Sequence, residues 1–211
     1  MDERLRAYGA ECLGTAWMVA VGTGSVALHA SHVVVCLTFG IAVAVAILVL
    51  RSSSGAHINP AVSTAFVLSG HLPRERWLGY VVAQLLGGLL GSAAVVLLIG
   101  PEQVAPTVLA SGISPLQGVG IEVLITAALM ASIYAIVALK DESTVAVAAW
   151  VGATVAVLAW VAGPLTGASM NPARTFGPNL ISGEGLLVFY ALTTTTGAAL
   201  AAVGWNRIRT A

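Results

Sequence analysis

The sequence contains two copies of the tripeptide Asn-Pro-Ala, at residues 59–61 and 171–173, whose residue types suit the binding of a small polar molecule. Asn is favoured immediately before a helix and Pro at its first position, so each copy predicts a helix start. A helix N-terminus carries about half a positive charge, and an Asn side chain has two amide donors. Each copy could therefore hydrogen-bond a small polar molecule and repel cations, unless its Asn only caps the helix. The candidate residues are Asn59, Pro60, Ala61, Asn171, Pro172 and Ala173.

Ionisable side chains also stand inside apolar stretches, namely Glu11, Glu122 and Arg174. If those stretches span a membrane, each charge costs about 2.5 to 3.5 kcal/mol, which makes it a functional candidate. Arg174 could offer fixed donors to a neutral solute and repel cations, or it could be an interfacial Arg that reaches the headgroups. Glu11 and Glu122 could relay protons, but their equivalent positions favour carboxylates that accept backbone N–H groups and brace a loop. His57 is expected to brace the first loop or to line an inner vestibule.

The composition identifies the surroundings of these residues. The chain has 211 residues, 58% of them hydrophobic and 9% charged, and its mean hydropathy is +0.94. Soluble domains carry about 25% charged residues, so these charges are too few to cover a surface exposed to water. Nine basic and nine acidic residues leave no net charge, which argues against nucleic acid as a partner. We therefore expect a membrane protein with the lipid bilayer around it.

Long runs without charged residues predict six transmembrane helices, because one span needs about 20 mostly apolar residues. We expect no cleavable signal peptide, so the first span should remain in the mature protein. Cys12 and Cys36 fall inside predicted spans and are interpreted as packing residues, not as a disulfide or metal ligands. The predicted spans are residues 7–28, 33–51, 76–99, 117–139, 144–162 and 185–206.

The two tripeptides belong to an internal repeat. They are separated by 112 positions, residues 10–16 match 121–127 at an offset of 111, and Tyr80 matches Tyr190 at 110. Ordered matches of this kind indicate a duplication, with repeat one at residues 7–100 and repeat two at 117–208 of a single membrane domain, residues 1–211. Because each repeat crosses the membrane three times, the second enters from the opposite side and is inverted.

Each Asn-Pro-Ala opens a segment too short to cross a bilayer, residues 59–69 and 171–181. The residues before them, 52–58 and 163–170, are polar and are expected to be irregular backbone. Such backbone at membrane depth must be buried in protein or line a wet cavity. The sequence thus predicts an all-α membrane protein in which two half-helices enter from opposite faces and frame a pore.

Basic residues predict the orientation. Eight of the nine lie before the first span, between spans two and three or four and five, or after the sixth: Arg4, Arg6, Arg51, Arg74, Arg76, Lys140, Arg207 and Arg209. In a six-span topology all these segments lie on one face. The positive-inside rule assigns that face, with both termini, to the cytoplasm, and we expect a plasma or inner membrane.

Residues 54–62 and 167–174 resemble the paired signatures of the aquaporin, or major intrinsic protein, family, and the similarity extends over essentially the whole chain. The resemblance implies the aquaporin hourglass fold, a pore through each subunit and a homotetramer; nothing in the spacing demonstrates the tetramer. It also implies passive conduction of water and small neutral solutes, with protons and ions excluded. In such pores, the positive ends of half-helices or an Arg are a known barrier to protons and cations.

By the same resemblance, the narrowest ring of the pore comprises Phe39, Ala159, Ala168 and Arg174. Strict water channels usually have His at the second position, so two alanines imply a wider opening, similar to plant nodulin-like intrinsic proteins and some bacterial relatives. A slip of one residue would put Trp160 in place of Ala159. Thr175 and Asn179 stand where glycerol facilitators typically have Asp and a basic residue. Thr194 stands where the family commonly has Pro, so the sequence does not decide whether span six is bent there.

An ion-coupled secondary transporter is the alternative function, because inverted repeats and broken helices also occur in that class. An enzyme is not expected, since no nucleophile, base and orienting acid converge on any motif and no metal-ligand cluster is visible. We expect no cofactor. The choice among water, glycerol, urea and undissociated metalloid acids stays open at this stage.

Overall fold

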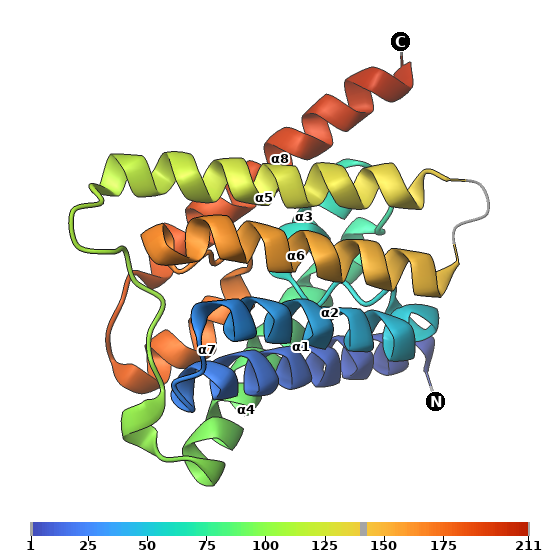
Figure 1. Cartoon of the computed structure of the whole chain (residues 1–211). Helices are drawn as coiled ribbons and strands as arrows, with labels where there is room; N and C mark the ends of the chain where they lie inside the picture. Colours follow the sequence, from blue (N-terminus) through green and yellow to red (C-terminus); the bar gives the residue numbers. More distant parts are fainter. Residues whose placement is uncertain (1, 140–142, 211) are drawn as a thin grey trace.

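The computed structural model describes residues 2–139 and 143–210, and regular structure in these ranges is entirely helical (Figure 1). Six helices are long and two are short, with one further 3-10 turn, η1, at Pro101–Gln103. The long helices are α1 (Glu3–Ala27), α2 (His32–Ser54), α4 (Arg74–Leu98), α5 (Pro115–Val137), α6 (Thr144–Thr166) and α8 (Leu187–Thr210), and the short ones are α3 (Pro60–Leu68) and α7 (Pro172–Ser182).

The long helices match the six predicted spans. Five of them, α2, α4, α5, α6 and α8, are long and apolar enough to cross a membrane by length and composition. The remaining one, α1, has 25 residues and is more polar because it buries Glu11 and Thr15 on its inner face. On its outer face Leu13 is exposed, as expected for a side chain in lipid. The prediction of six spans and two short helices is confirmed.

Two predicted boundaries are wrong. Residues 52–54 and 163–166 were expected to be irregular, but α2 continues to Ser54 and α6 to Thr166. Both helices end at a glycine in the left-handed region, Gly55 at φ 90° and Gly167 at φ 73°, whose N–H groups bond the last turn. Pro164 is tolerated inside α6 because the carbonyl that its missing N–H leaves free, that of Trp160, accepts a hydrogen bond from His32 Nε2 at 3.0 Å.

The two halves pack in equivalent ways. α1 packs along α4 and α5 along α8, and α2 packs against α6 across the two halves. Each short helix lies against a helix of the other half, α3 against α8 and α7 against α4. α8 is continuous through Thr194, whose hydroxyl donates to the Tyr190 carbonyl at 2.6 Å, so the absent Pro leaves an uninterrupted helix here.

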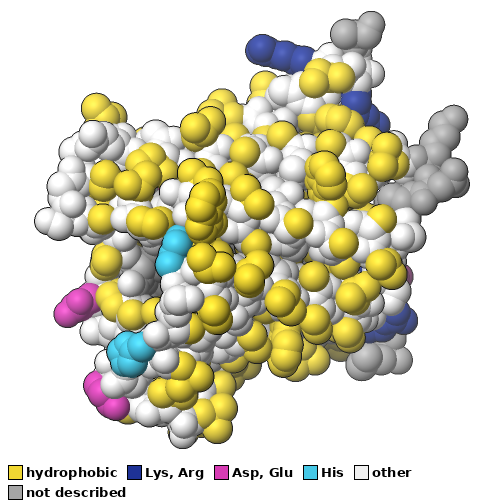
Figure 2. Space-filling model, viewed as in Figure 1, with side chains coloured by type: hydrophobic (Ala, Val, Ile, Leu, Met, Phe, Trp, Pro, Cys, Tyr) yellow, Lys and Arg dark blue, Asp and Glu magenta, His cyan; other side chains and the backbone are white. Residues whose placement is uncertain are grey.

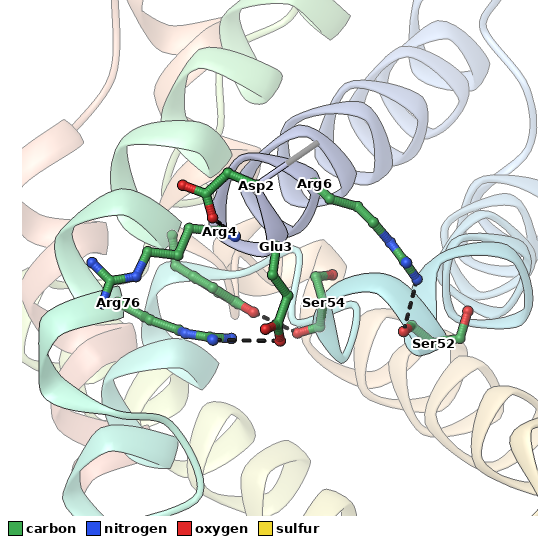
Figure 3. Close-up of polar contacts among 8 residues, drawn as sticks. Asp2, Glu3, Arg4, Arg6, Ser52, Ser54 and Arg76 are labelled. Carbon is green, nitrogen blue, oxygen red and sulfur yellow. Dashed lines mark hydrogen bonds and ion pairs between the residues drawn. The ribbon is translucent and has the colours of Figure 1, made fainter.

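Basic side chains lie at the end of the molecule that holds both termini, and apolar side chains cover the middle of the face in Figure 2. Polar contacts join helix ends there (Figure 3). Arg6 donates to the Ser52 carbonyl at 3.3 Å, and Arg76 pairs with Glu3 at 3.4 Å. α1, α2 and α4 are thus tied together at this end. Lys140, which contributes to the predicted orientation, lies outside the described residues.

Candidate functional site

The two short helices meet with their N-termini facing each other, each capped by its Asn. Asn59 Oδ1 accepts from the Ala61 N–H, and Asn171 Oδ1 from the Ala173 N–H, both at 2.9 Å. Each amide nitrogen then reaches across to the other half: Asn59 donates to the Met170 carbonyl and Asn171 to the Ile58 carbonyl, both at 2.8 Å. An amide has two N–H groups, so Asn59 keeps one donor for a molecule beside it, whereas Asn171 Nδ2 also lies 3.9 Å from Met18 Sδ.

The segments before the two helices have the same unusual backbone. Ala56 and Ile58 in the first half, and Ala168 and Met170 in the second, have φ between 44° and 52°. Left-handed conformations in residues other than glycine cost about 1 to 3 kcal/mol each, so the surroundings must hold them.

Glu11 holds the first of these segments. Its carboxylate accepts from the His57 N–H at 2.9 Å, the Ile58 N–H at 2.6 Å and the Ser54 hydroxyl at 2.6 Å. Gln84 Nε2 adds a fourth bond at 2.8 Å. Glu11 is fully buried, and its oxygens are occupied by groups of the segment it contacts.

Glu122 makes the equivalent contacts in the second half. It accepts from the Ser169 N–H at 2.9 Å, the Met170 N–H at 3.1 Å and the Thr166 hydroxyl at 2.6 Å. Each carboxylate therefore accepts hydrogen bonds from the segment that precedes the short helix of its own half.

Sequence reasoning missed several members of this framework. Ser54 and Thr166 are the matched hydroxyl partners of the two carboxylates, and their offset of 112 equals that of the tripeptides. Tyr80 and Tyr190, recognised only as a repeat match, donate to the carbonyls of Ser54 and Thr166, both at 2.7 Å. A comparison of the two halves at the tripeptide offset would have found the hydroxyl pair.

Two cavities adjoin at the level of the tripeptides. The first, of about 350 Å³, opens toward the end with both termini and is lined by Asn59, Asn171 and His57 among mainly apolar side chains. The second, of about 210 Å³, lies on the other side, and Val155 lines both. His57 also contacts α3, because its Nδ1 lies 3.1 Å from the Ser63 hydroxyl and its ring packs on Phe66.

The second cavity brings together the four residues that the family resemblance assigned to the constriction. Phe39, Ala159, Ala168 and Arg174 all line it, although they come from α2, α6, the segment before α7 and α7. Trp160 points outward, with 58% of its surface exposed, so the alternative register with Trp160 in the ring does not occur.

Arg174 is held between an aromatic ring and a hydroxyl. Its guanidinium carbon lies 5.0 Å from the centre of the Phe39 ring, within the range of a cation–π contact. Its Nη1 donates to the hydroxyl of Thr107, in the segment between η1 and α5. Thr107 also lines the cavity, and sequence reasoning did not single it out.

Known proteins resemble this chain over most of its length. The family described as Major intrinsic protein matches residues 2–205. "Aquaporin NIP1-1" of Zea mays is 36% identical over 208 residues, which cover 95% of this chain and 73% of that protein. "Glycerol uptake facilitator protein-like 6" of Lactiplantibacillus plantarum is 34% identical over 206 residues, covering 94% and 95% of the two chains.

A solved structure has the same fold. The aquaglyceroporin from Plasmodium falciparum superposes with a TM-score of 0.89, covering 98% of this chain and 97% of that one at 23% sequence identity. With the apolar helices, these matches identify an integral, multi-pass membrane protein and point to a channel, not an enzyme. This chain belongs to the major intrinsic protein family.

Proposed function

We propose that this chain is a passive channel that carries water and small uncharged solutes across a membrane and excludes protons and ions. The observation that carries the proposal is the meeting of two oppositely directed helix N-termini at a pair of adjoining cavities, with Asn59 and Asn171 at the junction. Two half-positive helix ends at one level raise the energy of any cation there, hydronium included. A neutral molecule meets amide donors and no such barrier.

The solutes follow from the outer constriction. Ala159 and Ala168 leave space opposite Phe39, and Arg174 supplies donors at the edge of the cavity. A water molecule and a small polyol can both accept hydrogen bonds from a guanidinium, and the Phe39 ring offers an apolar wall to a carbon backbone. We propose glycerol, urea and undissociated metalloid acids as candidate solutes; the name of the Lactiplantibacillus plantarum relative refers to glycerol alone.

The ion-coupled transporter is the second candidate, and the surroundings of the two carboxylates argue against it. A coupling site needs a carboxylate that exchanges a proton or cation during transport. Glu11 and Glu122 are fully buried and accept backbone N–H and hydroxyl groups of their own segments. Releasing them would leave strained backbone without its partners.

We further propose that the face with the basic residues is cytoplasmic, that the protein lies in a plasma or inner membrane, and that it assembles as a homotetramer. The clustering of basic side chains at one end supports the orientation (Figure 2). The tetramer rests on family membership alone.

Stopped-flow light scattering on proteoliposomes tests the function. Vesicles with the protein should shrink faster than empty vesicles in an impermeant osmolyte, and should reswell faster in glycerol and in urea, without any ion gradient. Solute flux that requires a proton or sodium gradient would contradict the passive channel. A proton leak measured with an entrapped pH dye should equal that of empty vesicles.

A further inference from the structure

Asn179 does not line the second cavity, but it hydrogen-bonds Thr107, which does. Asn179 lies on α7, two turns beyond the tripeptide, and only 2% of its surface is exposed. Its Oδ1 accepts from the Thr107 N–H at 2.7 Å, and its Nδ2 donates to the Thr107 carbonyl at 3.0 Å. Both polar ends of one amide thus bind the backbone of a single residue, which fixes that residue's position and orientation.

Thr107 in turn contacts Arg174, which lines the second cavity. Thr107 belongs to an irregular segment between η1 and α5 and is buried, with 3% of its surface exposed. Its hydroxyl accepts from Arg174 Nη1 and lies 3.3 Å from the Thr175 hydroxyl. Arg174 has the Phe39 ring as its other neighbour in the cavity. The contacts run in series from Asn179 through Thr107 to the guanidinium that lines the opening.

We propose that Asn179 is a positioning residue for solute selection, resting on the proposed function of the constriction. By anchoring Thr107, it keeps the Arg174 guanidinium beside the Phe39 ring and out of the open part of the cavity. A guanidinium without the Thr107 hydroxyl gains rotational freedom and enters the space beside Ala159 and Ala168. Glycerol, which needs more of that space than water, loses more permeability.

The identity of Asn179 matters for this role. An Ala at the position leaves two buried backbone groups of Thr107 without these partners, so the segment shifts toward other partners or water. A basic side chain there could bond the carbonyl but could not accept the N–H. The Asn179 amide can both accept from the Thr107 N–H and donate to the Thr107 carbonyl, as the backbone of a neighbouring strand would.

Four variants in proteoliposomes test the proposal: Asn179→Ala, Thr107→Val, Thr107→Ser and the double variant Asn179→Ala with Thr107→Val. Thr107→Val removes the hydroxyl but keeps the backbone contacts to Asn179. Thr107→Ser keeps both. Leu180→Ala is the matched control, because Leu180 is the next residue of α7 and is 48% exposed. Each sample is normalised to the amount of folded, reconstituted protein.

The readout is the ratio of glycerol to water permeability, because lost folding or insertion lowers both fluxes together and leaves the ratio unchanged. Asn179→Ala and Thr107→Val should each lower the ratio about fivefold, the factor that one net hydrogen bond of about 1 kcal/mol corresponds to. The double variant should have about the same permeability ratio as each single variant, since both substitutions act through the contact between Thr107 and Arg174. Thr107→Ser and Leu180→Ala should keep the wild-type ratio.

An unchanged ratio of glycerol to water permeability in either Asn179→Ala or Thr107→Val would overturn the positioning role of Asn179. The proposed function would still stand if the wild-type protein conducts glycerol. Additive effects in the double variant would also overturn the positioning role, because two independent routes would then be at work. A wild-type protein that carries water but neither glycerol nor urea would instead contradict the wide constriction itself, and the positioning role with it.

Discussion

The space in the proposed constriction depends on the small side chains of two residues. Ala159 and Ala168 line the cavity opposite Phe39, and each ends at Cβ. We expect the double substitution Ala159→His and Ala168→Cys to lower glycerol permeability about tenfold while water permeability changes less, because added atoms exclude the larger solute first; a tenfold change corresponds to about 1.4 kcal/mol of barrier. Stopped-flow measurements of both fluxes check this. Unchanged glycerol flux would mean that the constriction lies elsewhere.

Arg174 contributes charge as well as shape. Its guanidinium lies in the cavity beside Phe39, and we propose that it repels cations there before they reach the helix ends. Arg174→Val should raise proton or cation leakage on the order of tenfold, since 1.4 kcal/mol of lost barrier gives that factor. A pH-sensitive dye inside vesicles reports proton entry after an acid step. Arg207→Val, a loss of charge near the C-terminus, is the control, and an equally tight Arg174→Val pore would contradict the role of Arg174.

Glu11 and Glu122 can be tested as braces by replacing them with the isosteric amide. Glu11→Gln turns one oxygen that accepts N–H groups into a donor, so the contact to His57 or to Ile58 and Gln84 becomes repulsive. We expect Glu11→Gln and Glu122→Gln each to lower the free energy of unfolding by about 1 to 3 kcal/mol, the cost of an unsatisfied buried group. Thermal unfolding in detergent measures it. Unaltered stability with abolished transport would favour a proton relay instead.

At the scale of helices, the width of the pore depends on a close crossing of α2 and α6. A Cβ added to Gly40 would lie 2.5 Å from the Gly152 carbonyl oxygen, and one added to Gly152 would lie 2.6 Å from the Gly40 oxygen. Larger residues would force the two helices apart. Because Phe39 and Ala159 come from these two helices, their separation also sets the distance across the constriction.

Gly152→Val should therefore destabilise the fold by about 1 to 3 kcal/mol, as overpacking of an interior contact does. Thermal unfolding in detergent gives the difference from wild type. Gly120→Val is the matched control, since Cβ at this α5 position meets no atom within 4 Å. A Gly152→Val protein as stable as the control would mean that α2 and α6 do not constrain each other at this crossing.

In the whole molecule, basic side chains lie mainly at the end that holds both termini (Figure 2). The ends of α1, α2 and α4 that carry basic residues are joined by Arg6 and Arg76, and the loop before α8 lies at the opposite end (Figure 1). If the basic face is cytoplasmic, Glu184→Cys should react with a membrane-impermeant maleimide in intact cells. Arg207→Cys should react only after permeabilisation. The wild-type protein, with Cys12 and Cys36, gives the background, and the reverse pattern would contradict the orientation.

The architecture could be predicted from composition and repeats alone. Few charges require a lipid-facing surface, and an offset of about 112 between two helix starts, with three crossings per repeat, requires an inversion. The sequence also singled out Glu11 and Glu122 as a pair, because they recur at nearly the same offset. These conclusions follow from composition and from repeats along the chain, which need no knowledge of which helices touch.

The side-chain contacts across the pore could not be predicted in this way and are known from the folded arrangement of the helices. Thr107 carries no motif, and its partners Arg174 and Asn179 lie 67 and 72 positions away. The same holds for the bonds from Asn59 and Asn171 to the opposite segments, which sequence spacing could not assign. Local propensity and periodicity govern contacts within a helix, whereas a hydrogen bond across the bundle depends on the packing of all helices at once, and that packing is a property of the folded chain.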